Sequence, residues 1–285
     1  MPPIHMVILG QKSLGCQGMR IHILASGSSG NCALIEAGTG QDRVVLCLDC
    51  GIAQRTARDL AEQAGLSLTH VDGVLLSHHH GDHSLNVLGV AARAQAPLFA
   101  HEEALSQAKR TRPSEVRRRG VEVRPVSDRQ SFRVGPLTVT PIQLPHDAVP
   151  THGFLFESEG RRAGFFTDFG EIEVLQEAGL LDGVDTLVLE ANHDRRMLES
   201  GPYPYHLQQR VGGPLGHLAN VQTAELLASS APPTLRHLVL AHLSAHNNLP
   251  ELALGAAADA LDQRGLGGII LEAAPAKGYM AAGVS

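Results

Sequence analysis

No apolar run in this 285-residue chain reaches the roughly 20 residues that a membrane-spanning helix requires, so we predict a soluble protein without a membrane partner. Residues 1–18 lack a basic start and a cleavage site of small residues, which argues against a secretory signal. Because a strand-like run opens at Met19, we interpret residues 1–18 as a disordered or dispensable leader.

Cysteine is also scarce. Four cysteines in a chain of this length do not make a disulfide framework, and the cytoplasm is therefore the expected compartment. Cys47 and Cys50 form a CxxC pair, but the sequence has no second pair that could complete a zinc ribbon. We predict that both are thiols of the core.

The chain has no linker rich in proline, serine or glycine and no internal repeat, which favours one domain over residues 19–285. Apolar patterns predict strands at residues 19–25, 32–36, 44–49, 74–77, 98–101, 121–126, 137–144, 154–157, 164–168, 186–190, 235–242 and 268–272. They predict helices at residues 56–64, 85–94, 103–109, 172–176, 221–228 and 252–261. Short turns between the early strands and helices between the later ones indicate a layered α/β fold with mixed sheets.

Charge gives a weaker signal. The formal net charge of −6 argues against broad, non-specific affinity for nucleic acid, although a local phosphate site remains compatible with it. Residues 109–119 (KRTRPSEVRRR) form a basic cluster. We interpret it as a solvated helix end and loop, with contact to a polyanion as the alternative.

Histidine is abundant, with sixteen residues against three tyrosines and no tryptophan. Residues 74–83 (VLLSHHHGDH) place polar side chains where a buried strand ends. If the chain stays extended, His78 and His80 project to one side and converge on one cation, while His79 points away. Gly81 would let the backbone turn, and Asp82 and His83 would then begin the next helix and serve a second cation.

Two metals need more ligands, and other strand ends offer them at His146, Asp168 and His242, with Asp168 as the expected bridge. Seven such ligands contribute about −2 against about +4 from two divalent cations, which suits an anionic substrate. Nitrogen and carboxylate donors without thiolate fit Zn²⁺ best, and Mn²⁺ is possible. A metal pair of this kind readies a bridging hydroxide for attack.

The chain resembles the metallo-β-lactamase superfamily, and within it the YycJ/WalJ branch of bacterial phosphodiesterases. The resemblance is carried by a series of motifs from residue 19 to about residue 253: ASGSSGNC (25–32), LDCG (48–51), SHHHGDH (77–83), PHDA (145–148), TDFG (167–170), LEANHD (189–194), GHLAN (216–220) and LAHLSAHNN (240–248). The HxHxDH pattern is shared by the superfamily, whereas the last three motifs are much narrower.

The resemblance implies a four-layer αββα sandwich with the metals at one edge. It implies that one metal is held by His78, His80 and His146 and the other by Asp82, His83 and His242, with Asp168 between them. It also implies nuclease activity, with 5′-to-3′ exonucleolytic trimming of DNA in repair. Asp82 and His193 are the residues that we expect to be catalytic, with His193 as a general acid or a phosphate contact and a structural hydrogen-bonding role as its alternative.

Four further residues are candidates for substrate contact: Ser28, Asn31, His217 and Asn220. Ser28 and Asn31 lie in a Gly/Ser/Asn loop that could donate hydrogen bonds to phosphate, although such loops are also common hairpin turns. The rival enzyme class is a small-molecule hydrolase on the same fold, such as a thioesterase, lactonase or β-lactamase. A redox di-iron protein fits less well, because His80 stands where such relatives commonly carry a carboxylate. A non-catalytic binding module is the alternative of a different class.

Overall fold

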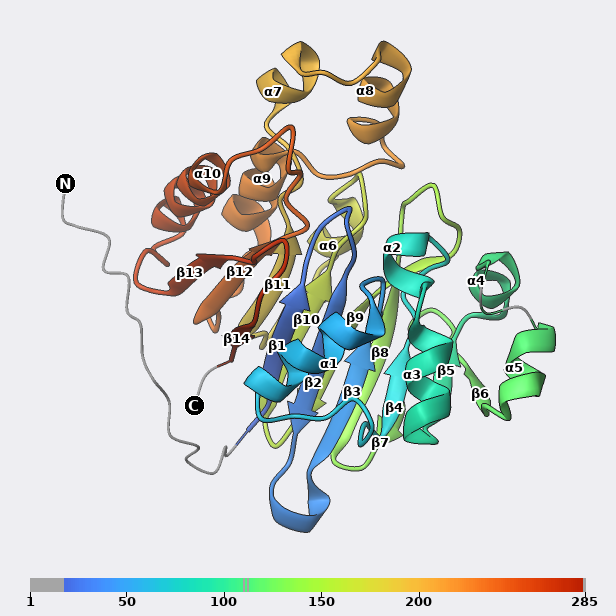
Figure 1. Ribbon diagram of the computed structural model, residues 1–285. Coiled ribbons are helices and arrows are strands. Elements are labelled where there is room, and N and C mark those ends of the chain that lie inside the picture. Colours follow the sequence, from blue (N-terminus) through green and yellow to red (C-terminus); the bar gives the residue numbers. More distant parts are fainter. Residues whose placement is uncertain (1–17, 110, 112, 284–285) are drawn as a thin grey trace.

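The computed structural model describes residues 18–109, 111 and 113–283. In this part of the chain the strands form two sheets of seven strands each, which lie face to face with helices on their outer sides (Figure 1). The predicted leader lies outside the described residues, except for residue 18. Within the described chain, no helix combines the length and the apolar character that crossing a bilayer would need.

The first sheet combines antiparallel and parallel strands. Its strands are β1 (Arg20–Ala25), β2 (Cys32–Ala37), β3 (Val44–Leu48), β4 (Gly73–Leu75), β5 (Leu98–Ala100), β6 (Val123–Pro125) and β14 (Met280–Ala282). Their order is β14-β1-β2-β3-β4-β5-β6. Pairing is antiparallel from β14 to β3 and parallel from β3 to β6.

The second sheet repeats this division. Its strands are β7 (Phe132–Val134), β8 (Leu137–Leu144), β9 (Thr151–Ser158), β10 (Arg161–Phe166), β11 (Thr186–Glu190), β12 (His237–Ala241) and β13 (Ile270–Ala273). Their order is β13-β12-β11-β10-β9-β8-β7, antiparallel from β7 to β10 and parallel from β10 to β13. Both sheets are mixed, as predicted.

Three apolar layers hold the sandwich together. Between the sheets, Leu46 and Leu75 of the first sheet share one buried cluster with Phe154 and Val188 of the second. On the outer face of the first sheet lie α1 (Gln54–Gln63) and α3 (Val87–Ala94). On the outer face of the second lie α6 (Glu173–Gln176), α9 (Asn220–Ser230) and α10 (Pro250–Gln263). The layers run helix, sheet, sheet, helix, which confirms the predicted αββα fold.

The predicted strands follow the burial that each environment imposes. All five residues of β11 and of β12 are buried, as expected for central parallel strands covered on both faces. Strand β8 begins with alternating buried and half-buried residues, the pattern of an antiparallel strand. Cys47 and Cys50 are free and buried, as predicted for core thiols.

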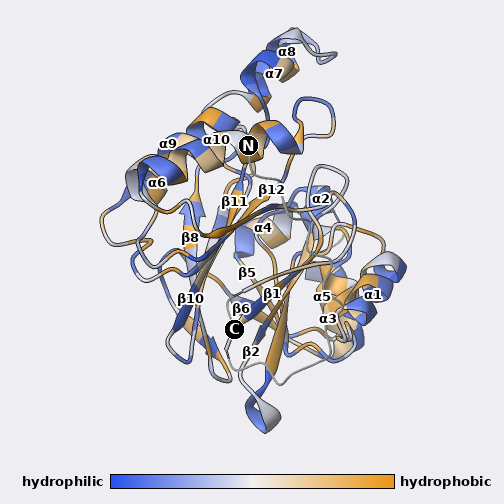
Figure 2. Cartoon of the chain, turned by 90° about the vertical axis from the view of Figure 1, so that its left-hand side faces the viewer, coloured by the Kyte–Doolittle hydropathy of each residue, from blue (hydrophilic) through white to orange (hydrophobic). Residues whose placement is uncertain are grey.

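Two short helices, α7 (Arg195–Ser200) and α8 (Tyr205–Val211), stand out from one end of the sandwich in both ribbon views (Figures 1 and 2). We call residues 195–211 the cap. Leu198 is the one buried residue within its two helices, so little apolar contact ties the cap to the body. Helices α4 (Glu102–Gln107) and α5 (Pro113–Arg119) lie at the side of the first sheet near β5 and β6 (Figure 1), and α5 carries the exposed Arg117, Arg118 and Arg119 of the basic cluster.

The prediction of one helix over residues 85–94 is wrong at its start. The chain instead forms a four-residue helix, α2 (Gly81–Ser84), and begins α3 at Val87. Asn86 separates them, because its backbone N–H donates to Cys50 O and its side chain donates to Ile52 O. Asp82 and His83 therefore lie on a separate short helix held by the loop after β3. A one-turn 3-10 helix at Gly40–Asp42 completes the helices of the described chain.

Candidate metal centre

The loop after β4 brings four of the predicted ligands to one edge of the sandwich. The rings of His78 and His80 lie with their centroids 4.8 Å apart. Asp82 and His83 follow on α2, with His83 fully buried and Asp82 partly exposed. His79 belongs to none of the ligand groups, as predicted for a side chain that points away, and it lines a second pocket together with His80.

The turn in this loop does not depend on glycine. Gly81 has no positive φ, and a Cβ built on it would meet no atom within 4 Å. The chain turns at Gly81 as expected, but an L-residue with a side chain would fit the same conformation.

The second sheet supplies the other three ligands from strand ends. His146 follows β8, Asp168 follows β10 and His242 follows β12. Asp168 and His242 have φ angles of 65° and 55°, in the left-handed region that residues other than glycine rarely adopt. Outliers of this kind persist where the surrounding structure requires them, and they cluster at functional sites.

All seven predicted ligands converge. Ligand atoms lie within 4.8 Å of one another in each of these groups: His78, His80 and His146; Asp82, His83 and His242; His78, His83 and Asp168. The oxygens of Asp168 lie 3.3 Å from His83 Nε2 and 3.5 Å from His242 Nε2. The geometry thus forms two sets of three ligands, with Asp168 beside members of both.

Several of these atoms lack hydrogen-bond partners. In the described chain, the buried atoms His78 Nε2, His146 Nε2, His242 Nε2 and Asp168 Oδ2 have no hydrogen-bond partner. A buried polar atom left unsatisfied costs about 1–3 kcal/mol, so such atoms are rare and call for a ligand. Three nitrogen lone pairs and a carboxylate oxygen directed into one space form a donor set that fits divalent cations.

The remaining ring nitrogens are held by groups that sequence reasoning missed. Asp49 Oδ2 lies 2.8 Å from His83 Nδ1, and Glu190 Oε1 lies 2.9 Å from His242 Nδ1. Gly216 O accepts from His146 Nδ1 at 3.0 Å. Each contact places the proton on Nδ1 and leaves Nε2 to face the centre, which is how metal-binding histidines are oriented in proteins.

A signal for both carboxylates was present in the sequence. Asp49 directly follows the buried strand β3, and Glu190 is the last residue of the buried strand β11. Asp168 and His242 were found by this same position at a strand end. Asp49 and Glu190 likewise end predicted strands, but no role in the metal centre was predicted for them.

Buried opposite charges shift the pKa values in this centre strongly. Burial alone would lower the pKa of His242, but Asp168, Asp82 and Glu190 raise it to about 10. Burial would raise the pKa of Asp168, but His242 and His83 hold it well below its usual range. The carboxylates stay charged and require positive charge nearby, which protons or divalent cations can supply.

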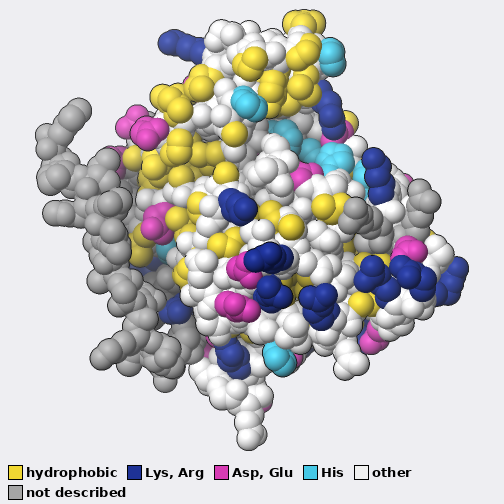
Figure 3. Space-filling model, viewed as in Figure 1, with side chains coloured by type: hydrophobic (Ala, Val, Ile, Leu, Met, Phe, Trp, Pro, Cys, Tyr) yellow, Lys and Arg dark blue, Asp and Glu magenta, His cyan; other side chains and the backbone are white. Residues whose placement is uncertain are grey.

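A pocket of about 390 Å³ opens onto these ligands. It is lined by Ser28, His80, Gly81, Asp82, Asp147, Asp168, Tyr203, Leu207, Arg210, Val211, Gly216, His217 and His242. Figure 3 shows histidine side chains reaching the surface beneath the cap. The pocket therefore connects the candidate ligands with solvent, as a substrate site requires.

The candidate substrate residues fall into two groups. Ser28 and His217 line the pocket. Asn31 is buried, and its amide contacts Gly27 and His83 Nε2. Asn220 is buried in a reciprocal pair of amide hydrogen bonds with Asn248, so its position gives no support to a substrate contact.

The two candidate histidines outside the ligand set also differ. His193 is buried and absent from the pocket lining, and burial lowers its pKa to about 4. His217 lines the pocket, with Nδ1 2.8 Å from Glu190 Oε1. Its position suits contact with a bound substrate better than that of His193.

Comparisons with known proteins agree with this arrangement. A family model described as a beta-lactamase superfamily domain matches residues 34–243. Exodeoxyribonuclease YycJ of Bacillus anthracis is 31% identical over 254 residues, which covers 88% of this chain and 92% of the relative. Exodeoxyribonuclease WalJ of Streptococcus pneumoniae serotype 2 is 29% identical over 252 residues, covering 88% of this chain and 91% of the relative.

Solved structures share the fold at low sequence identity. Unliganded yeast PDE1 aligns with a TM-score of 0.67 and 12% identity, over 94% of this chain and all of that chain (100%). The metallo-beta-lactamase fold protein YhfI from Bacillus subtilis aligns with a TM-score of 0.64 and 16% identity, over 92% of this chain and 99% of that one. The chain belongs to the beta-lactamase superfamily and is a metal-dependent hydrolase of its YycJ/WalJ-like branch.

Proposed function

We propose that this protein hydrolyses phosphodiester bonds in DNA as a 5′-to-3′ exonuclease, with two divalent cations in its centre. The observation that carries the proposal is the convergence of seven ligands in two sets of three, with Asp168 beside both. Two relatives that match most of the chain are named exodeoxyribonucleases, and this supports DNA as the substrate.

The proposed ligand sets follow the clusters. His78, His80 and His146 would hold one cation, and Asp82, His83 and His242 the other, with Asp168 shared. Zn²⁺ is the proposed metal because imidazole donors dominate, and Mn²⁺ is the alternative because carboxylates also take part. When bound, the cations would lower the pKa of a shared water toward neutrality and neutralise charge on the attacked phosphate.

His217 is the proposed proton donor to the leaving oxygen. Burial would raise the pKa of Glu190, but His217 and His242 lower it to about 2, so Glu190 remains a carboxylate. It accepts a hydrogen bond from His217 Nδ1 and fixes the ring against the pocket. In its doubly protonated form His217 would carry a second proton on its other ring nitrogen, and it could pass this proton to the alkoxide that forms as the phosphodiester bond breaks.

The test is an assay with the purified chain, loaded with Zn²⁺ or Mn²⁺, on end-labelled single-stranded and duplex DNA. We expect DNA to be shortened from its 5′ end, about two metal ions per chain, and no turnover by Asp82→Ala. Asp259→Ala is the matched control, because Asp259 is exposed on α10 and outside the pocket. It should retain full activity.

Nitrocefin and a thioester in the same assay address the rival class of small-molecule hydrolases. Rapid turnover of either with inert DNA would replace the nuclease proposal with that rival. Fewer than about two metals after reconstitution would contradict the ligand sets.

A further inference from the structure

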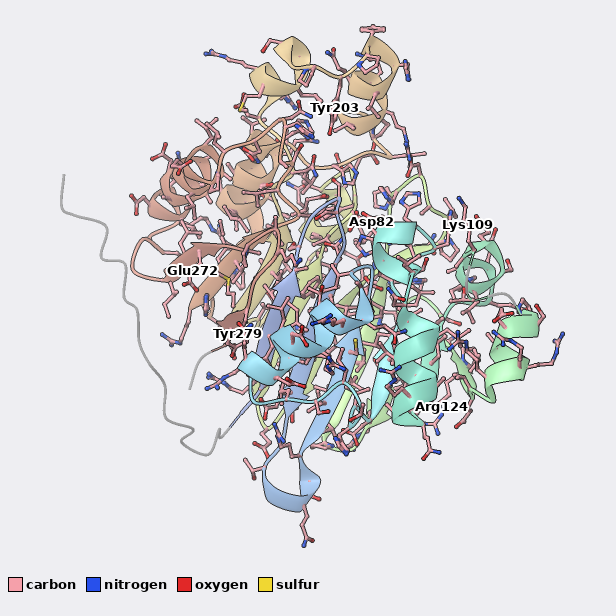
Figure 4. The ribbon with its side chains drawn as sticks, viewed as in Figure 1. Asp82, Lys109, Arg124, Tyr203, Glu272 and Tyr279 are labelled. Carbon is pink, nitrogen blue, oxygen red and sulfur yellow. The ribbon has the colours of Figure 1, made fainter. Side chains whose placement is uncertain are left out.

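The cap forms one wall of the pocket over the metal centre. Tyr203, Leu207 and Arg210 of the cap line the same pocket as Asp82 and Asp168. Figure 4 shows Tyr203, in the connection between α7 and α8, above Asp82 on α2. Neither metal binding nor proton transfer uses the cap side chains, so their position against the pocket calls for another role.

The carboxylate of Asp147 lies between Arg210 and the candidate metal ligands His80 and His146. Its Nε donates to Asp147 Oδ2 at 2.5 Å. The other oxygen of Asp147 lies 3.5 Å from His80 Nε2 and 3.4 Å from His146 Nε2. The guanidinium is therefore beside the metal centre and separated from the ligand nitrogens by Asp147.

The terminal amino groups of Arg210 remain available for a ligand. The side chain is 60% exposed, and Asp147 is its one polar partner in the described chain. Among the described residues that line the pocket, Arg210 is the one with a permanent positive charge. A guanidinium with free donors matches the oxygens of a phosphate group, which it can bind through two parallel hydrogen bonds.

The position of Arg210 determines which phosphate it can bind. The scissile phosphate would bind at the seven candidate ligands, and Asp147 separates the guanidinium from them. A second phosphate on the same nucleotide would lie next to the first. The end of a strand carries such a group when it terminates in a phosphate monoester.

Tyr203 suits the nucleoside of that terminal nucleotide. It is half-buried and lines the pocket, and its ring lies 6.0 Å from the ring of His246 at an interplanar angle of 64°. Aromatic faces stack on bases without regard to sequence. The pocket volume of about 390 Å³ lies within the range of roughly 300–1,000 Å³ of small-ligand sites.

We propose that the cap recognises a phosphorylated strand end, with Arg210 binding the terminal phosphate monoester and Tyr203 packing on its nucleoside. This inference rests on the proposed nuclease function and deepens it by naming the end group that the site selects. With the proposed 5′-to-3′ polarity the terminal phosphate is on the 5′ end, whereas a preference for a 3′ phosphate would contradict that polarity. The experiment separates the two.

The first experiment measures initial cleavage rates for one oligonucleotide with four end combinations: phosphate or hydroxyl at the 5′ end and at the 3′ end. We expect the wild-type protein to prefer a phosphate at one end by about tenfold or more, as a charge-assisted hydrogen bond provides. Arg210→Ala should lose that preference, so that its rates on phosphate-ended and hydroxyl-ended DNA become equal. Tyr203→Ala should raise KM for all four substrates.

Matched controls come from the cap itself. Arg196 and Tyr205 are exposed cap residues outside the pocket lining. Arg196→Ala and Tyr205→Ala should keep both the preference and the KM of the wild type. Effects of these controls as large as those of the pocket variants would mean that the cap acts through its fold or net charge, and would overturn the proposal.

The second experiment does not require DNA cleavage. Calorimetry of the zinc-loaded protein compares thymidine 3′,5′-bisphosphate with the two thymidine monophosphates. The wild type should bind the bisphosphate about tenfold or more tightly, and Arg210→Ala should bind all three alike. If DNA is inert but this difference holds, the nuclease function fails and the phosphate site stands. If wild type shows no gain from the second phosphate, or Arg210→Ala retains it, the proposal is wrong.

Discussion

Asp49 fixes both the position and the tautomer of one ligand. Its Oδ2 lies 2.8 Å from His83 Nδ1, and its Oδ1 accepts from the backbone N–H of Ser77 at 2.8 Å. The first contact keeps the proton on Nδ1, so Nε2 presents its lone pair, which faces the centre and lies 2.8 Å from the Asn31 amide nitrogen. The second ties the carboxylate to the loop that carries His78. One buried side chain thus orders both ends of the ligand loop.

Asp49→Asn should weaken metal binding by about 10–100-fold, the usual cost of losing a partner that orients a ligand. The amide has no negative charge to favour the proton on His83 Nδ1. Its NH2 group is also a donor, and it would face Ser77 or His83, whose own groups donate to the carboxylate of Asp49. The measurement is a zinc dissociation constant from competition with a chromophoric chelator.

Asp72→Asn is the matched control, because it makes the same substitution away from the metal centre. Asp72 accepts from the backbone N–H of Val45, at the end of β3 away from the metal centre. This variant should keep the zinc affinity of the wild type. Equal affinity of all three proteins would contradict the role assigned to Asp49.

At the scale of elements, α2 is held between two loops. Asn31 N donates to Asp82 O at 2.7 Å, and Cys50 N donates to His83 O at 2.8 Å. Gly51 packs so closely that a Cβ on it would overlap the carbonyl of Asp82. The loops after β1 and β3 therefore set where the helix with two ligands can lie.

Gly51→Ala should destabilise the protein by about 1–3 kcal/mol, the usual cost of overpacking, and should lower its metal content. The added methyl group forces α2 away from the loop after β3, which displaces Asp82 and His83 from the other ligands. Urea denaturation gives the free energy of unfolding, and metal analysis after gel filtration gives the occupancy.

Gly255→Ala is the matched control on α10. A Cβ at Gly255 meets no atom within 4 Å, and alanine favours the helix by about 1 kcal/mol over glycine. This variant should be as stable as the wild type or more stable. A Gly51→Ala protein with unchanged stability and metal content would show that α2 tolerates displacement.

Elements with a strong pattern could be predicted from the sequence. The bounds predicted for β8 and β11 coincide with those observed, because long apolar patterns require burial on a known face. Strands β7 and β14 are short and mostly half-buried, so no apolar run marks them, whereas the equally short β4 and β5 are fully buried. The cap helices bury one side chain, so no apolar stripe marks them.

The same reasoning explains what was found in the site. Ligands such as His146 and Asp168 follow apolar strands, and parallel strands deliver their ends to one edge. Whether His193 or His217 can contact substrate depends on which ring lines the pocket. The sequence does not show this, because His217 is positioned by Glu190, which also contacts His242 in the folded chain. No role was predicted for Arg210, because no helix was predicted over the residues that form α8.

At the scale of the molecule, the metal centre joins the two sheets. His78, His80, Asp82 and His83 come from the loop after β4 in the first sheet, whereas His146, Asp168 and His242 follow strands of the second. Bound cations would therefore connect two halves that otherwise meet through apolar contacts between their inner faces. A ligand set divided in this way forms only when both sheets have folded and packed.

Chelation should therefore lower the melting temperature. A ligand that binds only the folded state at about 1,000 times its Kd stabilises that state by about 4 kcal/mol, which corresponds to roughly 10 °C for a protein of this size. Differential scanning fluorimetry with and without EDTA measures the shift, and added Zn²⁺ should restore it. Asp168→Asn, which lacks the shared ligand, should show a smaller shift. An identical melting temperature for loaded and chelated protein would mean that cations do not join the sheets, because any binding at these ligands must favour the folded state.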